Sequence, residues 1–332
     1  MAQLNGSSGL TLTVLGCGTM GIAILSGMMA TLEDMEQGAP TSRQPHSGTA
    51  TPAEEIPLRL PSRFIACVRR PESAKRIKTS LAHYRSANLT TLLNENVKGV
   101  QEADVVLLGC KPQMFREILS APGMKEALSG KLLISILAGV TIDQMEGLLY
   151  GEELPSDACR VVRAMPNTAS FVRESMTVIA NSTPPLPPHL SALITWIFTR
   201  IGRVVHLPPT AMDVSTALCG SGPAFMALIL EAIADGAVAM GLPRAEAQLM
   251  AAQTMRGTTG LVLNGEHPAI LRDKVSTPGG CTIGGLLVLE EGRVRGSCAR
   301  AIREATVVAS QLGKGIQGVN GTRFMMHGAG DS

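Results

Sequence analysis

A glycine-rich turn close to the N-terminus constrains the fold of this chain more than any other feature. The short apolar run Leu10–Leu15 leads directly into Gly16-Cys-Gly18-Thr-Met-Gly21 and then into a helical pattern through about Met29. In such a strand–turn–helix unit, the first glycine allows a tight turn, the second lets a pyrophosphate approach, and the third lets the helix pack closely on the strand. The motif therefore predicts a dinucleotide-binding site made by Gly16, Cys17, Gly18, Thr19, Met20 and Gly21.

Further apolar runs extend this unit into a larger sheet. They predict strands at residues 63–68, 87–91, 104–109, 131–136, 175–180 and 203–207, with helical patterns between several of them. This alternation predicts a doubly wound α/β domain, which binds ligands at the carboxyl ends of its strands. Lys111 is thereby placed near the cofactor, and the small residues Ala138 and Gly139 would let a nicotinamide ring lie against the backbone. A solvated lysine is the alternative at Lys111, and Asn167 would bond a ligand or close a turn.

Two arginines follow the predicted second strand. Arg69 and Arg70 stand where an NAD-specific fold usually offers an acidic residue to the ribose 2′-hydroxyl group. Two guanidinium groups favour a 2′-phosphate instead, because arginine matches the geometry and charge of phosphate. The pair predicts NADPH as the cofactor, with NADH possible. The alternative is a solvated basic corner.

The pattern changes at Pro208-Pro209, which divides the chain into two predicted domains. Residues 1–208 form the Rossmann-type domain, in which residues 34–61 lack periodicity and predict a disordered insert. Residues 209–332 contain no strand candidates and end in a predicted loose tail from residue 313. Helical patterns cover residues 212–240, 244–263, 269–273, 283–291 and 295–312. The predicted fold class is therefore α/β followed by all-α, with a helical dimerisation domain.

Composition excludes several classes of partner. A formal net charge of +2 and 3% aromatic residues argue against a nucleic-acid surface. The seven cysteines form no C-x-x-C pair, so neither a disulfide framework nor a metal site is expected. The N-terminal residues resemble no signal or transit peptide, which predicts a cytoplasmic location. The apolar run at residues 217–240 contains Glu231 and Asp235, so we expect a buried helix of a soluble protein rather than a membrane span.

A second turn, in the helical half, predicts a site for a small anion. Pro278-Gly-Gly280 precedes Cys281-Thr282 and a helical apolar pattern. Glycines at 279 and 280 allow positive φ, so the chain would turn sharply and expose the N–H groups of Gly280, Cys281 and Thr282 at the positive end of a helix. A carboxylate fits there. The alternative is an ordinary loop in which Thr282 is only the helix N-cap.

Taken together, these motifs resemble the pyrroline-5-carboxylate reductase family over nearly the whole chain. The resemblance rests on the first glycine turn, Cys110-Lys-Pro112, Ala138-Gly-Val140, Met165-Pro-Asn-Thr168, Gly220-Ser-Gly-Pro-Ala-Phe225 and, above all, Val275-Ser-Thr-Pro-Gly-Gly-Cys-Thr282. It implies cofactor contacts from Asn96, Cys110, Lys111, Pro112, Ala138, Gly139 and Asn167, and substrate contacts from Val275, Thr277, Gly280, Cys281 and Thr282. Two features depart from the pattern: Lys274 replaces an asparagine found in many relatives, and the 34–61 insert is long.

The resemblance also implies a reaction and an assembly. A protonated cyclic imine is already electrophilic and the cofactor carries the hydride, so positioning is most of the task. Thr282 is the catalytic candidate, and the substrate is a small imine held between one subunit's cofactor and the helices of a homodimer or higher homo-oligomer. Two alternatives remain: a related cyclic-imine reductase of another pathway, and a dinucleotide-sensing protein without turnover.

Overall fold

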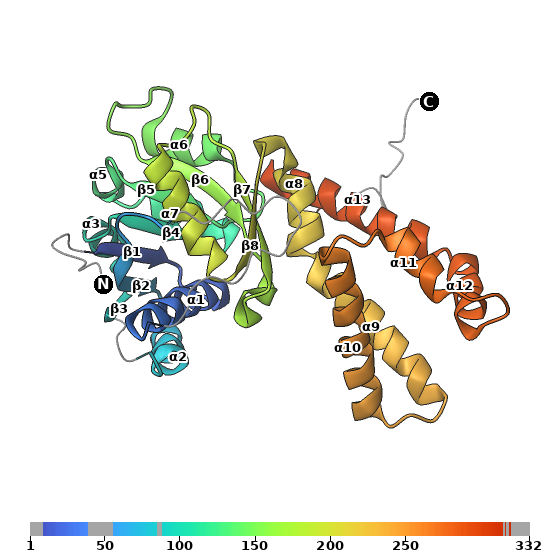
Figure 1. The fold of residues 1–332 in the computed structure, drawn as a ribbon. Coiled ribbons are helices and arrows are strands. Elements are labelled where there is room, and N and C mark those ends of the chain that lie inside the picture. The colour runs from blue at the N-terminus through green and yellow to red at the C-terminus, as the bar shows by residue number, and fades with distance from the viewer. Residues whose placement is uncertain (1–8, 39–55, 85–87, 315, 317–318, 320–332) are drawn as a thin grey trace, which may run out of the picture.

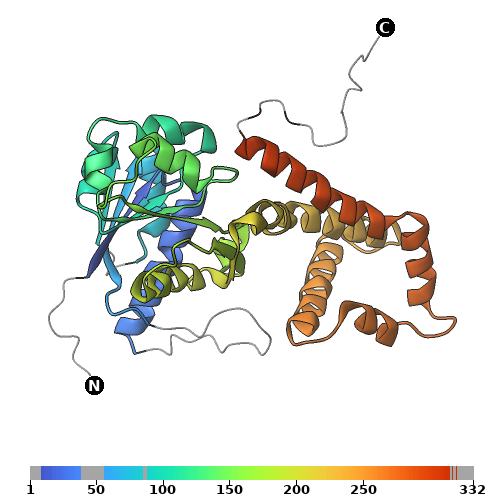
Figure 2. The same ribbon diagram turned by 90° about the horizontal axis from the view of Figure 1, so that it is seen from above.

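The structure, a computed structural model, combines an eight-stranded sheet with a projecting arm of helices (Figures 1 and 2). It describes residues 9–38, 56–84, 88–314, 316 and 319. The strands are β1 (Leu10–Leu15), β2 (Pro61–Val68), β3 (Asn88–Leu93), β4 (Val105–Leu108), β5 (Leu132–Ser135), β6 (Arg160–Met165), β7 (Ser175–Ala180) and β8 (Gly202–Leu207). Their order is β3-β2-β1-β4-β5-β6-β7-β8, and the sheet is parallel except where β7 pairs with β6. The predicted Rossmann-type sheet is confirmed, and the antiparallel β6–β7 pair makes it a mixed sheet.

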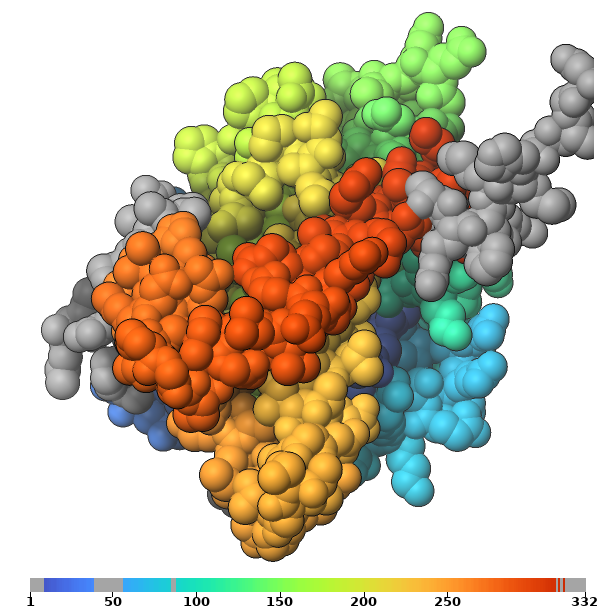
Figure 3. All heavy atoms as spheres, turned by 90° about the vertical axis from the view of Figure 1, so that its right-hand side faces the viewer, coloured from blue at the N-terminus to red at the C-terminus, as the bar shows by residue number. Residues whose placement is uncertain are grey.

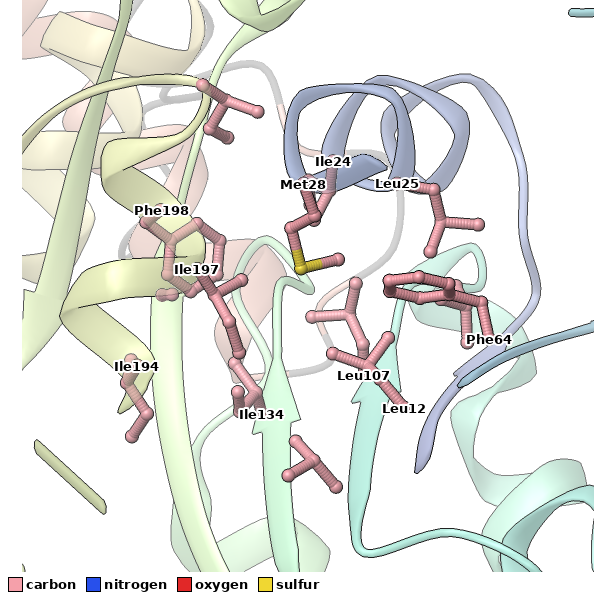
Figure 4. Packing of buried hydrophobic residues seen from close by; sticks show 14 of the residues in the cluster. Leu12, Ile24, Leu25, Met28, Phe64, Leu107, Ile134, Ile194, Ile197 and Phe198 are labelled. Carbon is pink, nitrogen blue, oxygen red and sulfur yellow. The ribbon is translucent and has the colours of Figure 1, made fainter. Parts of the chain in front are cut away.

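Helices cover both faces of this sheet because its central strands are apolar on both sides. One core cluster joins the strands to α1 (Thr19–Glu36), α2 (Pro71–Leu81) and α7 (Pro188–Thr199). Figure 4 shows part of it, with Met28 of α1 between Phe198 of α7 and the sheet residue Leu107. The opposite face is covered by α3 (Asn96–Gln101), α4 (Phe115–Leu119), α5 (Met124–Leu128) and α6 (Ile142–Tyr150). Short 3₁₀ helices η1 (Pro112–Met114) and η2 (Thr168–Val172) follow β4 and β6.

The first helix and second strand are longer than the sequence indicated. Helix α1 continues to Glu36, because Met28, Met29, Ala30 and Thr31 remain buried against the core. Strand β2 begins at Pro61. The predicted insert at 34–61 is therefore wrong at both ends, and its central residues 39–55 lie outside the described part of the chain.

The helical arm begins directly after β8. It contains η3 (Pro209–Ala211), α8 (Met212–Ser215), η4 (Thr216–Gly220), α9 (Gly222–Ala239), α10 (Arg244–Leu263), α11 (Pro268–Val275), α12 (Cys281–Glu291) and α13 (Val294–Gly313). Helices α9 and α10 form a hairpin, and α13 runs back toward the sheet (Figures 1 and 2). Figure 3 looks onto the arm, where the orange and red residues of α11 to α13 lie across the front. Gly313, predicted in the loose tail, instead ends α13, and most of residues 315–332 lie outside the described residues.

The predicted single helix at 212–240 is interrupted by the π-helical segment η4. Pro223 has no N–H group, so the carbonyl of Cys219 one turn earlier cannot accept the usual helical hydrogen bond. The chain accommodates this with a wider turn, in which the N–H of Ser221 donates to the carbonyl of Thr216 at 3.0 Å. The Cys219 carbonyl is thereby available to another donor.

The apolar helix of the arm is largely uncovered within one chain. Among the described residues, Pro209–Ala239 is long and apolar enough to cross a membrane by length and composition, and 17% of its most apolar window is buried. Leu228 is 67% exposed and Ile233 is 56% exposed. The sequence predicted a buried helix here, and within its own chain the helix is not buried. Glu231 and Asp235 interrupt it with charges that a membrane interior disfavours.

Candidate active site

The glycine turn has the geometry that its sequence predicts. Gly16 has a φ of +73°, which favours glycine, and a Cβ there would come within 2.6 Å of the Cα of Cys110. At Gly21 a Cβ would meet the Cγ1 atom of Val14 at 3.1 Å, so this glycine lets α1 pack closely on β1. The nearest atom to a Cβ on Gly18 would be the Gly16 carbonyl oxygen, at 3.9 Å. The space in front of Gly18 is therefore a cradle that a side chain would fill.

The start of α1 supplies hydrogen-bond donors to this cradle. Gly18 is the N-cap and has no side chain to cap the helix. The first helical bond runs from the N–H of Ile22 to the Gly18 carbonyl at 3.0 Å, which leaves the N–H groups of Thr19, Met20 and Gly21 without a helical partner. Three donors at the positive end of an 18-residue helix fit a pyrophosphate group.

The other predicted cofactor residues lie at the same edge of the sheet. Strands β1 to β5 are parallel to their neighbours, so the residues that follow them converge. These are Arg69 and Arg70 after β2, Asn96 at the start of α3, Cys110, Lys111 and Pro112 after β4, and Ala138 and Gly139 after β5. Arg69, Arg70, Lys111 and Ala138 are exposed, whereas Cys110 is buried behind Gly16.

The buried cysteines at this edge are not suited to nucleophilic chemistry. Burial raises the pKa of Cys17 and of Cys67 to about 12 and that of Cys110 to about 11, so these thiols stay protonated at neutral pH. All seven cysteines are free. Within the described residues, no group of three His, Cys, Asp or Glu side chains is placed to hold a metal ion.

The end of α13 reaches this edge, which the sequence did not indicate. Gly139 has a φ of +74°, and a Cβ on it would come within 3.0 Å of the backbone nitrogen of Gly313. The side-chain amide of Gln144 donates to the Gly313 carbonyl at 2.7 Å. The loop after β5 is therefore fixed by the last residue of α13 as well as by the capping box of Thr141 and Gln144 at the start of α6.

Asn167 joins the sheet to the helical arm. Its Nδ2 donates to the Cys219 carbonyl at 2.9 Å, the acceptor that Pro223 leaves without a helical partner. Its Oδ1 accepts from the N–H of Ala169 at 3.0 Å and so caps η2. The side chain is buried, and these bonds use its acceptor and one donor. The geometry therefore favours the turn-closing role over the predicted cofactor contact.

We expect Asn167→Ala to destabilise the fold more than it weakens cofactor binding. Loss of the cap and of the bond to Cys219 should lower the free energy of unfolding by about 1–3 kcal/mol. The Michaelis constant for NADPH should change by less than about twofold, or about 0.4 kcal/mol, because both side-chain bonds of Asn167 are made within the protein. Thermal unfolding and steady-state kinetics test both statements; an unchanged melting temperature with weak cofactor binding would restore the cofactor role.

The predicted anion clamp contains a regular turn. The N–H of Gly280 donates to the Thr277 carbonyl at 3.0 Å and Gly279 has a φ of +67°, as in a type II turn with Pro278 at its second position. Gly280 itself has a φ of −80°, so only one of the two glycines adopts positive φ. A Cβ on Gly280 would come within 2.4 Å of the Thr277 Oγ1, which explains the glycine. The Gly280 amide closes the turn, so the prediction that it is a free donor was wrong.

Helix α12 begins with uncapped N–H groups directly after this turn. Gly280 is its N-cap and Cys281 its first residue, so Thr282 is not the N-cap that the alternative reading required. The amides of Cys281 and Thr282 lie in the first turn, where a helix has no internal acceptors for them. Val275 and Cys281 are exposed, and Thr282 is half-buried. Beside them, Lys274 donates to both carboxylate oxygens of Glu266, at 2.8 and 2.9 Å.

Within one chain, the two halves of the site lie apart. Figures 1 and 2 both show the α11–α12 turn on the arm, well away from α1 and the sheet edge. The structure thus brings the cofactor residues together, and separately the residues Val275, Thr277, Gly280, Cys281 and Thr282.

A Rossmann sheet with a glycine cradle, joined to an apolar helical arm, defines a dinucleotide-dependent oxidoreductase with an oligomerisation domain. Residues 209–312 match the family model of pyrroline-5-carboxylate reductase dimerisation, and residues 11–139 match that of the coenzyme F420-dependent NADP oxidoreductases. The chain is 64% identical to pyrroline-5-carboxylate reductase of Lophium arboricola, covering 96% of this chain and 98% of that protein. It is 55% identical to the Neurospora crassa enzyme of the same name, covering 97% and 98%. The chain belongs to the pyrroline-5-carboxylate reductase family and is an oxidoreductase acting on a C=N bond.

Solved structures share the whole fold. The pyrroline-5-carboxylate reductase of Coxiella burnetii has a TM-score of 0.72 at 28% identity, covering 92% of this chain and 99% of that one. The pyrroline carboxylate reductase of Plasmodium falciparum, solved with NADP bound, has a TM-score of 0.71 at 22% identity, covering 93% and 100%. The predicted combination of a Rossmann domain and a helical dimerisation domain is confirmed.

Proposed function

We propose that this chain reduces 1-pyrroline-5-carboxylate to L-proline with NADPH, in a site that a second copy of the chain completes. The observation that carries the proposal is the turn before α12, which presents the uncapped amides of Cys281 and Thr282 in a chain that also holds a glycine cradle. A dinucleotide-sensing protein has no use for such a second anion site.

The residues of the chain bind and orient the reactants. The amides at the start of α12 would hold the carboxylate of the imine, and the Thr282 hydroxyl would bond the carboxylate or the ring nitrogen. Gly16 to Gly21 would hold the cofactor pyrophosphate, and Arg69 and Arg70 its 2′-phosphate. When bound, NADPH supplies the hydride that reduces the C=N carbon. A protonated imine needs no further acid, so correct positioning of the ring accounts for most of the required catalysis.

The uncovered apolar surface of the arm supports a homodimer as the smallest assembly. Besides the exposed face of α9, a groove of about 430 Å³ lies between α9 and α10 and is lined by apolar residues that include Ile233, Leu242, Met250 and Met255. Apolar surface of this extent is stabilised by burial against a partner. Because the two half-sites lie apart in one chain, the α12 turn of one copy would meet the cofactor edge of the other.

We expect multi-angle light scattering to give a mass of at least two chains at assay concentrations. Because one chain has a mass of 34.8 kDa, the measured mass would be about 70 kDa or more. Charged substitutions in the α9–α10 groove, such as Ala251→Glu, should lower both the mass and the activity. A fully active species with the mass of a single chain would overturn the shared site.

The activity itself is tested with purified protein, NADPH or NADH, and two substrates. We expect oxidation of NADPH that depends on pyrroline-5-carboxylate and yields proline. A six-membered cyclic imine carboxylate is the matched alternative substrate; a higher kcat/KM for it would point to a related imine reductase. Cofactor binding without turnover of either imine would support the sensing protein instead.

A further inference from the structure

We propose that Arg76 of α2 joins Arg69 and Arg70 in binding the 2′-phosphate of NADPH, and so contributes to selectivity for NADPH over NADH. This inference rests on the proposed function, because it concerns the cofactor of the same site. The sequence did not single out Arg76, which lies eight positions after the second strand.

The position of Arg76 within α2 directs it toward the cofactor edge. Its neighbour Ile77 is fully buried in the core cluster that also contains α1, whereas Arg76 is exposed. Helical side chains lean toward the N-terminus of their helix. Here that end is Pro71, directly after Arg69 and Arg70. We therefore expect the guanidinium group of Arg76 to extend toward the corner at which β2 ends.

An electrostatic interaction also links Arg76 to the glycine turn. Burial and, to a lesser extent, Cys67 raise the pKa of the Cys17 thiol, and the positive charge of Arg76 opposes this rise. Cys17 lies inside the glycine turn, so the guanidinium acts across the gap between α2 and the start of α1. The adenosine ribose of a dinucleotide lies between these same two elements in a Rossmann domain.

Within the described residues, no carboxylate forms an ion pair with the arginines of this corner. None of the ion pairs among the described residues involves Arg69, Arg70 or Arg76. Glu72 lies one helical turn before Arg76 and is exposed, but no ion pair joins the two in the described part of the chain. Three unpaired guanidinium groups suit a phosphate dianion far better than a ribose hydroxyl group.

The test compares Arg76→Ala with Lys78→Ala in the full-length protein. Lys78 is also exposed and cationic, but it lies in the last turn of α2, away from the β2 edge. We expect Arg76→Ala to raise the Michaelis constant for NADPH by about three- to tenfold, between the effects of an exposed ion pair and of a charge-assisted hydrogen bond. In Arg76→Ala, the Michaelis constant for NADH and kcat should stay within about twofold of their original values, and the melting temperature within a few degrees. In Lys78→Ala, these three quantities and the Michaelis constant for NADPH should all stay within the same limits.

Calorimetry can measure the affinities for adenosine 2′,5′-bisphosphate and for AMP without any imine substrate. These measurements therefore test the role of Arg76 separately from the proposed function. Arg76→Ala should weaken the bisphosphate by the same factor as NADPH and leave AMP unchanged. Equal weakening of both would assign Arg76 to the 5′-phosphate, and no weakening would remove it from the site; either result overturns the proposal. Failure to reduce the imine, with the bisphosphate result as expected, would overturn the proposed function alone.

Discussion

Replacing Arg69 and Arg70 together with alanine should raise the Michaelis constant for NADPH by about ten- to more than a hundredfold. Charge-assisted hydrogen bonds to a phosphate contribute roughly 1.5–3 kcal/mol, and each tenfold change corresponds to about 1.4 kcal/mol. Both side chains are exposed at the end of β2, so solvent screening favours the lower part of this range. Steady-state kinetics with each cofactor at saturating imine gives the measurement.

NADH is the internal control for this experiment, because it lacks the 2′-phosphate. Its Michaelis constant should hardly change, and the ratio of the two constants should move toward unity. Folding should be unaffected, since Arg70 caps α2 through its backbone carbonyl, which accepts from the N–H groups of Ser73 at 3.1 Å and Ala74 at 3.3 Å. Equal losses with both cofactors would mean that the arginines support the fold or the pyrophosphate rather than the 2′-phosphate.

Thr282→Val should lower kcat/KM for the imine by roughly five- to more than a hundredfold at saturating NADPH. The valine keeps the shape of the side chain but removes the hydroxyl group, and a buried substrate atom left unpaired costs about 1–3 kcal/mol. The Michaelis constant for NADPH should stay nearly unchanged, because the α12 turn and the glycine cradle belong to different parts of the chain.

The melting curve of the same variant distinguishes the catalytic role from a structural one. Thr282 is the second residue of α12 and caps no helix, so its hydroxyl contributes little to stability. Thr79→Val, an equivalent change on the exposed side of α2, is the matched control and should alter neither kinetics nor melting. A lowered melting temperature with normal kcat/KM would reduce Thr282 to a structural residue.

Local patterns predicted the regular elements well where one physical cause dominates. Ser175–Ala180 and Arg244–Leu263 were predicted to the residue, because an apolar run or a helical period ends there at a clear boundary. The end of α1 was missed because its last turn carries Glu33, Asp34 and Glu36 and is only partly buried, while the preceding turn holds the helix on the core. The break in the helix at η4 follows from Pro223. This proline was visible in the sequence, but the apolar run around it favoured the prediction of one continuous helix.

The candidate site was predictable where a motif specifies the backbone. The glycine turn and the turn at Pro278 need particular φ values, and few residue types provide them. Arg76, the Gly139–Gly313 contact and the Asn167–Cys219 bond depend on which elements pack together, and no local pattern carries that information. The free amide predicted at Gly280 was wrong because the turn consumes it.

The separation of the two half-sites within one chain has a genetic consequence. If each site takes its cofactor edge from one copy and its α12 turn from the other, a lesion at Arg69 and Arg70 and a lesion at Thr282 affect different contributors to each site. A mixed dimer of two such defective chains then contains one site with both lesions and one site with neither. Two alleles that each impair the enzyme when expressed alone would therefore complement one another.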